Sequence, residues 1–581
     1  MVKTIAIIGC GPRGLSALED IFTEYVKNKR AYELKVLIFE RTGKFGCGQV
    51  YAPNQTLHNW LNINERALTI AERERIQLNN ESVEGFPSFQ DWNGYDPDST
   101  EEIDAYPPRA VLGTYLEARF NSMAKKLKQC NVLEMHASLV TSLKFKNDAF
   151  LIEDDKQKTY SADEVVLTVG HQPTQISKQI ENWKQHEANT VGVTLYHKPY
   201  PIEGLFNDST INGNSRVAIR GFGLAMIDVV RGIAGFTNSR FDIVNSDTQK
   251  MTFHPGANCP KKIIPFSLDG LPMAPKPINA SIDNWFLPTD AHFNMLKGNL
   301  KNYRSQPEQV DSTATIVTTM AKIIVDVFLS LRTKSISHNY NTEALQTLVE
   351  AYIEDDKTAS DIIISNTLSA KTIMECFVNM AVGQQKISLD YCIGQVWRHC
   401  QPTLYEYLSY TEFHKDVILD IIQLDEKLKR LSFGPPVASL QQLLALLESG
   451  IMTVKAVDDP NIECTKNGWV LDGLNNDFTA NIMINSVLDS PKVLLTDTPL
   501  IKQLLKDKYV FPIHEKLGFK TNKNGMASST SKEQELPPIA VLGRLAQGTL
   551  LGVDAVLECF GKRSKFWAKD VLKRLDKKKI N

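Results

Sequence analysis

The feature that most constrains the fold lies at the start of the chain, where an apolar strand runs directly into a glycine-rich turn. Residues 4–8 are apolar or β-branched, and they lead into Gly9-x-Gly11-x-x-Gly14. A helical pattern over residues 15–25 follows, and then a second apolar run over residues 34–40 that ends in Glu40. This order of strand, turn, helix and strand is a βαβ unit. It predicts a Rossmann-like α/β fold.

Each glycine of this turn has its own task if the unit binds a dinucleotide. The first permits the tight turn, the second lets backbone approach a pyrophosphate, and the third lets helix and strand pack closely. The phosphates then lie at the helix N-terminus, where unpaired N–H groups and the helix dipole favour negative charge. Glu40 is placed to accept hydrogen bonds from an adenosine ribose. The alternative is a tight turn that binds no ligand, and the order of the parts favours dinucleotide binding.

The residues after Glu40 favour FAD over NAD as this first nucleotide. Arg41 leads into a second glycine-rich turn that contains Gly43, Gly46 and Gly48. A cofactor longer than NAD needs backbone to pass along its middle, and glycine permits such a close approach. We therefore expect FAD at this site.

A second unit of the same kind lies near the middle of the chain. Residues 216–220 have a strand pattern and lead into Gly221-x-Gly223, and residues 224–235 have a helical one. This pattern predicts a site for the pyrophosphate of NADPH or NADH at the helix end. Met226 stands where the third glycine is expected, so a turn that only packs is an open alternative. Asp228, in the first helical turn, is expected to cap backbone N–H groups.

The remaining pattern divides the chain into four segments. We expect the first part of an FAD-binding domain over residues 1–205 and an NAD(P)-binding-like domain over residues 206–310. Residues 311–430 are almost wholly helical in periodicity, which predicts a helical insert. Short strands return after a Gly-Pro-Pro turn, so residues 431–581 are expected to complete the FAD-binding domain.

Charge and cysteine content narrow the functional classes. Lys and Arg number 65 against 67 Asp and Glu, a net charge of −2, so no broad basic field attracts nucleic acid or anionic lipid. The 9 cysteines are scattered without CxxC spacing, which predicts reduced thiols, a cytoplasmic location and no metal site. Residues 315–331 are the most apolar run, but Lys322 and Asp326 interrupt it, so we expect a buried helix and no membrane span. None of these features determines the oligomeric state.

Several further motifs follow one another in a specific order. They are Phe45-Gly46-Cys47-Gly48-Gln49-Val50-Tyr51, Leu61-Asn62-Ile63-Asn64, Pro108-Arg109-x-x-x-Gly113-x-Tyr115-Leu116, Thr168-Val169-Gly170-His171, Gly221-Phe222-Gly223-Leu224-Ala225-Met226-Ile227-Asp228, Phe433-Gly434-Pro435-Pro436 and Val541-Leu542-Gly543-Arg544-Leu545-Ala546-Gln547-Gly548. With the first glycine turn, they resemble the FAD-NAD(P)-binding proteins that include FAD-dependent urate hydroxylases and related flavin N-oxygenases. The resemblance covers most of the chain outside the helical insert. It implies a flavin-binding fold with two nucleotide-binding halves.

The resemblance also implies roles for single residues. Thr168 and Gly170 would lie near the FAD, and the segment at Gly543 would close over it late in the sequence. Among His58, Trp60 and Asn62, which would face the isoalloxazine, Asn62 is favoured over His58. Arg544 stands where many such flavoproteins have an Asp that reaches the ribityl chain, so its contact with FAD is in question.

The partner for a 2'-phosphate of NADPH is also in question. Leu268 stands where the family often has an arginine, so Lys261, Lys262 or Lys276 would have to substitute. The residues predicted to bind the cofactors are Gly9, Gly11, Pro12, Arg13, Gly14, Glu40, Arg41, Gly46, Gly48, Asn62, Arg109, Thr168, Gly170, Gly221, Gly223 and Gly543.

Two further residues and one short segment each have two interpretations. Arg109 follows a proline-stiffened segment, where it either clamps a phosphate or carboxylate or pairs with an acidic side chain. His171 either lies near the flavin or substrate or bonds to the backbone of its own turn. Residues 397–399 either roof an active site or are core and surface residues of a helix.

Together these features predict an FAD-dependent oxidoreductase. The expected activity is a monooxygenase that uses NAD(P)H and O2 on a small polar, nitrogen-bearing substrate. The flavin supplies the chemistry, so the sequence marks no catalytic residue. No Ser-His-Asp order, P-loop or HExxH occurs, which leaves hydrolase and kinase functions without support. Two alternatives stay open: a nucleotide-binding redox sensor or scaffold without turnover, and a flavin reductase or dehydrogenase that does not oxygenate its substrate.

Overall fold

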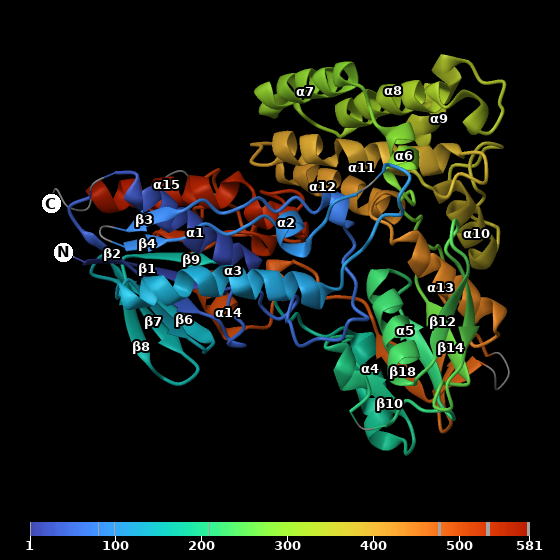
Figure 1. Ribbon diagram of the computed structural model, residues 1–581, viewed down its shortest axis with the longest axis horizontal. Coiled ribbons are helices and arrows are strands. Elements are labelled where there is room, and N and C mark those ends of the chain that lie inside the picture. Colours follow the sequence, from blue (N-terminus) through green and yellow to red (C-terminus); the bar gives the residue numbers. More distant parts are fainter. Residues whose placement is uncertain are drawn as a thin grey trace.

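The protein has two α/β regions and a layer of helices packed above the second of them (Figure 1). A computed structural model describes residues 2–28, 30–78, 81–97, 99–207, 209–473, 478–529 and 535–577. Within this described part no helix combines the length and apolarity that a bilayer crossing requires.

The first region is built on a parallel five-stranded sheet with the strand order β19-β9-β1-β2-β5. Its strands are β1 (Val2–Ile8), β2 (Glu33–Phe39), β5 (Leu133–His136), β9 (Glu164–Leu167) and β19 (Ile539–Val541). β1 and β2 pair in register from Val2 opposite Glu33 to Ile8 opposite Phe39. The βαβ unit predicted at the start of the chain is therefore confirmed.

Alternate residues of β1 pack into two different cores, because successive side chains of a strand face opposite sides of the sheet. Ile5 and Ile7 pack with the helices α1 (Pro12–Val26), α3 (Arg109–Gln129) and α15 (Lys562–Lys577). Ala6 and Ile8 face the opposite side. That side is covered by β6 (Val140–Lys146), β7 (Ala149–Asp154), β8 (Thr159–Ala162) and α14 (Pro499–Lys506). Cover on both faces explains why these strands are continuous apolar runs.

The second region has a parallel four-stranded sheet in the order β10-β18-β11-β14. Its strands are β10 (Thr194–Tyr196), β11 (Arg216–Arg220), β14 (Lys262–Phe266) and β18 (Ile482–Asn485). The helices α5 (Leu224–Phe236) and α4 (Lys178–Asn189) pack on opposite faces of this sheet.

Two of these strands lie outside the segment expected for this region. The sequence pattern assigned β10 and β18 to the FAD-binding segments 1–205 and 431–581, but both pair in the second sheet, β18 directly with β11. A short apolar run does not reveal which strand it will pair with, because its partner is chosen by tertiary packing. The boundaries at 205, 310 and 430 otherwise remain predictions.

The helical layer begins before residue 311. It consists of α6 (Ala280–Asp283), α7 (Asp290–Ser305), α8 (Ala314–Ser330), α9 (Thr342–Glu354), α10 (Ala370–Ala381), α11 (Leu389–Leu408) and α12 (Lys415–Ser432), and α13 (Val437–Glu448) follows it. The buried helix predicted over residues 315–331 is confirmed as α8. One continuous apolar core includes residues of this layer and of α5, so the layer and the second region share their packing.

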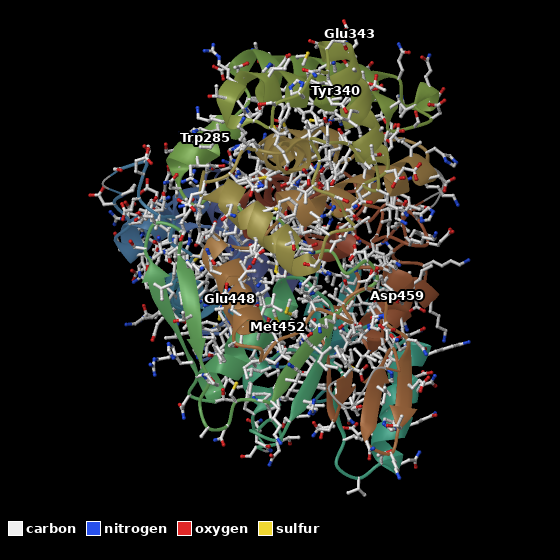
Figure 2. The ribbon with its side chains drawn as sticks, turned by 90° about the vertical axis from the view of Figure 1, so that its right-hand side faces the viewer. Trp285, Tyr340, Glu343, Glu448, Met452 and Asp459 are labelled. Carbon is white, nitrogen blue, oxygen red and sulfur yellow. The ribbon has the colours of Figure 1, made fainter. Side chains whose placement is uncertain are left out.

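Figure 2 shows this shared packing from the side, with Trp285 and Tyr340 on the helical layer and Met452 on the second region below it. Met452 lies in the chain after α13 and forms a bridge to Ile263 of β14. The remaining elements are small: β3 (Ile76–Leu78), β4 (Glu81–Val83), α2 (Phe89–Asn93), β12 (Arg240–Asn245), β13 (Lys250–His254), β15 (Ile462–Thr465), β16 (Gly468–Leu471) and β17 (Thr479–Ala480).

Candidate cofactor and substrate site

A cavity of about 1980 Å³ is lined by both α/β regions and by the helical layer. It lies at the carboxyl ends of the parallel strands, where ligands bind in open α/β sheets. Most of the predicted cofactor-binding residues line it: Gly9, Gly11, Pro12, Arg13, Glu40, Arg41, Gly48, Asn62, Arg109, Thr168, Gly170 and Gly543. Gly14, Gly46, Gly221 and Gly223 lie outside its wall. The tertiary structure thus brings together residues that are more than 500 positions apart in the chain, from Gly9 to Gly543.

The glycines of the first turn have the geometry that dinucleotide binding requires. Gly9 has φ +93°, and a Cβ there would lie 2.7 Å from the carbonyl oxygen of Thr168. A Cβ on Gly14 would lie 2.3 Å from the carbonyl oxygen of Gly9, so the third glycine permits the close packing of α1 on the turn. At Gly11 the nearest atoms to such a Cβ are 3.9 Å away, which leaves an open approach to the backbone.

The N-terminus of α1 is free to bind an anion. Gly11 is its N-cap and supplies no side-chain acceptor, and the first turn contains no acidic residue. Its N–H groups therefore have no side-chain partner, which is the condition for a phosphate site. The second glycine turn lies against this one, because a Cβ on Gly48 would be 3.1 Å from the Cα of Gly11. These residues fit the pyrophosphate of FAD.

Glu40 is buried and fastens the turn. Its carboxylate accepts hydrogen bonds from the backbone N–H of Cys10 at 2.9 Å and from the N–H and hydroxyl of Thr42 at 3.1 and 2.7 Å. An ionised carboxylate has roughly four acceptor sites, so capacity remains for a ribose hydroxyl. The sequence predicted only a contact of Glu40 with the ribose. The structure shows that Glu40 also stabilises the turn through these hydrogen bonds.

Arg13 contacts the C-terminal part of the chain. Its guanidinium forms an ion pair with the carboxylate of Glu558 and donates to the Glu558 carbonyl oxygen at 2.8 Å. A Cβ on Gly543 would lie 3.2 Å from Nε of Arg13. The late segment therefore lies against the first glycine turn and engages the side chain of Arg13, and its closure over the FAD remains a prediction.

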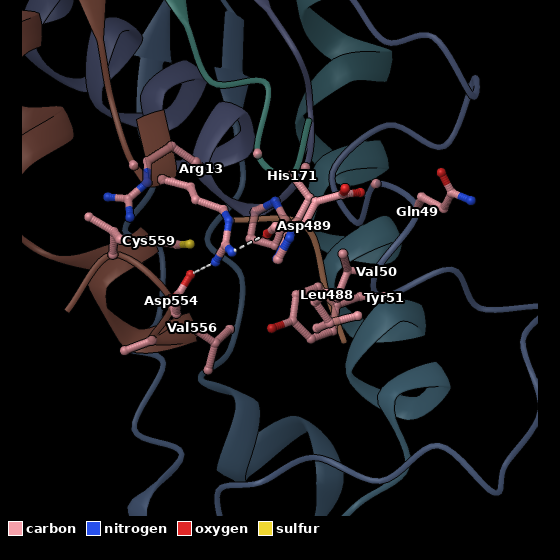
Figure 3. Close-up of a pocket in the computed structure, with 18 of the residues that line it drawn as sticks. Arg13, Gln49, Val50, Tyr51, His171, Leu488, Asp489, Asp554, Val556 and Cys559 are labelled. Atoms are coloured by element: carbon pink, nitrogen blue, oxygen red, sulfur yellow. Dashed lines mark hydrogen bonds and ion pairs between the residues drawn. The ribbon is translucent and has the colours of Figure 1, made fainter. Parts of the chain in front are cut away.

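Arg544 has an acidic partner beside the cavity. It forms an ion pair with Asp554 and donates to the carbonyl oxygen of Asp489 at 2.9 Å (Figure 3). His171 lies in the same part of the wall. Its ring forms no hydrogen bond with another described residue, so the predicted bond to its own turn is wrong. Burial and Arg544 lower the pKa of His171, which keeps the imidazole neutral at neutral pH.

The second glycine turn differs from the first because Met226 stands in place of the third glycine. Gly221 has φ +109°, and Gly223 is the N-cap of α5 without a side-chain hydrogen bond. Met226 is 1% exposed in the core that the second region shares with the helical layer. Leu224 and Ala225, the first residues of α5, line the cavity, so this helix N-terminus also faces it.

Arg220 is a residue that the sequence analysis missed. It ends β11 directly before Gly221, lines the cavity and donates to Oδ1 of Asn485 at 2.9 Å. Burial lowers its pKa, and no carboxylate of a described residue lies within ion-pair distance. A charged residue at the end of an apolar strand was the signal that could have identified it.

Of the three lysines predicted to substitute for the missing arginine, Lys276 lines the cavity, and Lys261 and Lys262 do not. Leu268 is 82% exposed, and Lys262 donates to the carbonyl oxygen of Gly450 at 2.7 Å. Neither residue lines the cavity, whereas Lys276 does.

Asp228 joins the two α/β regions, so its predicted capping role is wrong. Its carboxylate accepts from Nη2 of Arg109 at 2.6 Å, from the hydroxyl of Tyr200 at 2.6 Å and from Nη1 of Arg231 at 3.2 Å. The guanidinium of Arg231 lies 4.0 Å from the ring centre of Trp60. Of the two interpretations of Arg109, the structure shows the pairing with an acid, at the edge of the cavity.

The helical layer contributes to the wall through α11. Arg398 and His399 line the cavity, whereas Trp397 is buried and donates from Nε1 to Asp425 at 3.2 Å. Asn62 also lines it, and His58 and Trp60 do not. Of the two interpretations of residues 397–399, the roof applies to Arg398 and His399 and the core to Trp397.

Comparison with known proteins agrees with this geometry at the N-terminal region. Residues 6–172 match the FAD-NAD(P)-binding family. The predicted resemblance, the Rossmann-like fold class and the FAD and NAD(P) cofactor class are thereby confirmed for the FAD-NAD(P)-binding segment, which contains the first glycine turn, Glu40 and Thr168.

Curated relatives match a larger part of the chain at low identity. An L-aspartate N-monooxygenase (nitrosuccinate-forming) of Streptomyces cremeus is 24% identical over 282 residues, which is 44% of this chain and 41% of the relative. A nitrosuccinic acid synthase of Aspergillus oryzae is 25% identical over 262 residues, 44% of this chain and 39% of the relative. The chain thus spans less than half of the length of these relatives.

Solved structures that match this chain at low similarity include two monooxygenases. A caprolactone-bound cyclohexanone monooxygenase covers 100% of this chain at 11% identity with a TM-score of 0.43, and 88% of that chain is covered. An NADP-bound steroid monooxygenase has the same identity and TM-score, with 100% of this chain and 87% of that chain covered. Among the described residues no group of His, Cys, Asp or Glu is arranged to bind a metal ion.

Proposed function

We propose that this chain is an FAD-dependent monooxygenase that uses NAD(P)H and O2 to oxygenate the nitrogen of a small polar amine. The observation that supports it most is that the N-termini of α1 and α5 and the roof from α11 all face one cavity of about 1980 Å³. Single ligand pockets are typically about 300–1,000 Å³, so this cavity has room for two nucleotides and a substrate. The curated relatives are named as N-monooxygenases of aspartate, which supports nitrogen as the oxygenated atom.

The residues in the cavity wall indicate which part of each cofactor they would bind. Bound FAD would accept a hydride from the nicotinamide and activate O2. Gly11 and the N-terminus of α1 would hold the pyrophosphate of FAD, and Glu40 the ribose. Gly221, Gly223 and Arg220 would hold the phosphates of NAD(P)H. We propose these contacts together with the predicted ones at Gly9, Thr168, Gly170 and Gly543.

The reaction has a balance that can be measured. One amine, one O2 and one NAD(P)H with a proton give one hydroxylamine, one NAD(P)⁺ and one water. We expect the purified protein to be yellow and to bleach with NADPH or NADH under anaerobic conditions. With ¹⁸O2 and a substrate amine, mass spectrometry should find one labelled oxygen on nitrogen. Unlabelled product or peroxide alone would instead identify a reductase or oxidase.

A nucleotide-binding protein without turnover is the second candidate. It is favoured by Met226 in place of the third glycine and by the exposed Leu268 in place of an arginine. A yellow protein that neither NADPH nor NADH reduces would support it. We further propose a cytoplasmic location, because all 9 cysteines are free thiols, and no nucleic-acid partner, because the net charge is −2.

A further inference from the structure

One wall of the cavity collects basic side chains from distant segments. We call it the basic wall and define it by Arg66, Lys276, Arg398 and His399. Arg66 follows the first glycine turns, Lys276 lies between β14 and α6, and the other two lie on α11. Asp283, at the end of α6, also lines this part of the cavity, and Asp104 lies behind it.

The arginines and the histidine of the basic wall already have acidic partners. Asp283 pairs with Arg398, with Nη2 of Arg66 at 3.0 Å and with Nε2 of His399 at 3.1 Å. Arg66 also pairs with Asp104 at 2.8 Å. Burial disfavours the charge of Asp283, but Arg398 and His399 outweigh it and hold the pKa of this carboxyl well below its usual range. These groups therefore form a charge network that is complete without a ligand.

Lys276 has no such partner. Its Nζ donates to Oδ1 of Asn62 at 3.1 Å and to the carbonyl oxygen of Gly434, and the ring centre of Phe433 is 5.6 Å away. No carboxylate of a described residue lies within ion-pair distance of Nζ. Two acceptors leave one N–H of the ammonium group without a bond.

Backbone contacts hold the segment that carries Lys276 against residues 430–435. The backbone N–H of Lys276 donates to the carbonyl oxygen of Pro435 at 3.1 Å, and that of Ala274 donates to the carbonyl oxygen of Arg430 at 2.9 Å. A Cβ on Gly434 would lie 1.5 Å from the carbonyl oxygen of Ala274, so the two segments are in direct backbone contact. These contacts fix the backbone of Lys276, and Asn62 and Gly434 hold its Nζ atom at the cavity wall.

The ammonium group of Lys276 is half-buried at the cavity wall and has no counter-ion, which is unfavourable for its charged form. Burial and the nearby Arg398 lower the pKa of Lys276 well below its ordinary value, and Asp283 offsets this only in part. An anion in the cavity would supply the missing acceptor and the missing charge together.

We propose that Lys276 binds a carboxylate of the substrate and is the residue that selects amines bearing an acidic group. The identity of the ligand as substrate rests on the proposed function; the anion site itself rests on the geometry of Lys276. The opposing view is that Lys276 only fixes Asn62 and Gly434, and that it would do so equally well without charge.

Calorimetric titration of the FAD-loaded full-length protein separates these views. Succinate is the probe, because it has two carboxylates and no amine that can be oxygenated, and succinamide is its neutral counterpart. We expect the protein to bind succinate at least about tenfold more tightly than succinamide. Lys276→Gln should weaken succinate about 30-fold, since truncation of one partner of a buried charge pair costs about that much, and leave succinamide unchanged.

The matched control is Lys262→Gln, which removes a lysine that also donates to a backbone carbonyl but lies outside the cavity. It should leave succinate binding unchanged. Equal succinate affinity in Lys276→Gln and the unmodified protein would overturn the assignment. If Lys276→Gln does not fold, the comparison of succinate with succinamide in the unmodified protein decides, and no preference for succinate overturns the proposal.

The outcomes also distinguish this inference from the proposed function. Succinate binding that depends on Lys276, in a protein that oxygenates no amine, would leave the anion site standing and reject the monooxygenase. If the protein oxygenates amines but Lys276→Gln does not change its succinate affinity, the monooxygenase stands and the anion site at Lys276 is rejected.

Discussion

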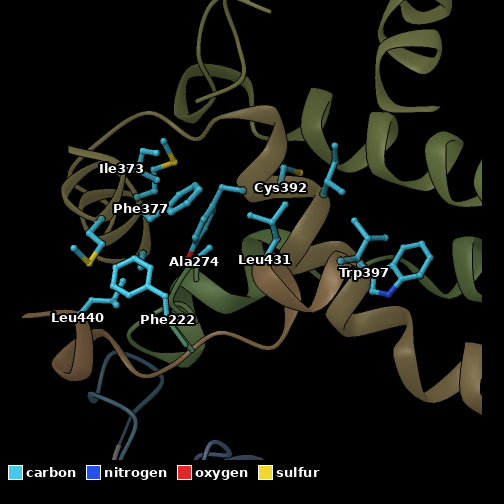
Figure 4. Close-up of a cluster of buried hydrophobic side chains, with 14 of the residues drawn as sticks. Phe222, Ala274, Ile373, Phe377, Cys392, Trp397, Leu431 and Leu440 are labelled. Carbon is cyan, nitrogen blue, oxygen red and sulfur yellow. The ribbon is translucent and has the colours of Figure 1, made fainter. Parts of the chain in front are cut away.

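The two glycine turns of this protein have the same sequence order and are stabilised in different ways. At the first turn, Glu40 bonds to the backbone of Cys10, and a Cβ on Gly14 would lie 2.3 Å from the Gly9 carbonyl oxygen. At the second turn, Phe222 and Met226 are buried in the apolar core that the second region shares with the helical layer. Figure 4 shows Phe222 in this core. Backbone hydrogen bonds hold both turns. The first turn adds a buried carboxylate and a close helix contact, whereas the second adds hydrophobic packing.

This difference explains why a methionine is tolerated at only one of them. The third glycine is needed where helix and strand approach closely. At the second turn, packing against the helical layer stabilises the helix instead. Both helix N-termini still face the same cavity. The two turns can therefore bind nucleotides while responding differently to substitution.

The largest effect is expected from Gly14→Val. Its Cβ would overlap the backbone of Gly9, so α1 must move away from the turn and the pyrophosphate site is lost. We expect protein that purifies without flavin, measured by the ratio of absorbance at about 450 nm to that at 280 nm, since the flavin supplies that band. Gly298→Ala is the control, because a Cβ there meets nothing within 4 Å. A yellow Gly14→Val protein would refute the close-packing role of this glycine.

Asp228→Asn tests whether α5 joins the two regions. The change leaves Arg109 and Arg231 without their carboxylate, and breaking a buried pair costs about 3–5 kcal/mol. Urea denaturation should show that decrease in the free energy of unfolding. Asp242→Asn removes an exposed ion pair with Arg240 and should change it by less than about 0.5 kcal/mol. Similar values for both variants would contradict the buried contact between the regions.

Met226→Ala examines the packing of the second turn directly. Loss of a buried methionine should lower the free energy of unfolding by about 2–5 kcal/mol, again measured by urea denaturation. Because the side chain lies in the core and not in the cavity, the affinity for NADP⁺ should stay the same. A tighter NADP⁺ complex in the variant would show that Met226 obstructs the phosphate site.

The smallest effect is expected from Arg220→Gln. We expect an affinity for NADP⁺ about tenfold lower, because a hydrogen bond from a charged group contributes about 1.5 kcal/mol or more, with FAD content unchanged. Arg240→Gln, in the exposed β12, is the matched control. Equal loss of FAD and NADP⁺ in Arg220→Gln would mean that the two turns do not act as separate sites. Quenching of flavin fluorescence by NADP⁺ measures the affinity.

Local elements of the fold were predictable because their signals are short-range. The strand over residues 216–220 coincides with β11, and the helix over 224–235 with α5. β18 was assigned to the wrong sheet, because its apolar residues Ile482, Met483 and Ile484 fit any buried parallel strand. The same reason applies to Arg220 and Lys276. Their chemistry depends on Asn485 and Asn62, which lie more than 200 residues away in the chain.

By itself the sequence determined the two glycine turns, the acid after the first and the helical character of the insert. Each of these depends on the spacing of residues within a short segment of the chain. Only the tertiary structure decided which strands form each sheet, that Asp228 joins the two regions and that Lys276 faces the cavity without a counter-ion. Pairing and burial depend on atoms brought together from distant segments, and no local spacing encodes that meeting.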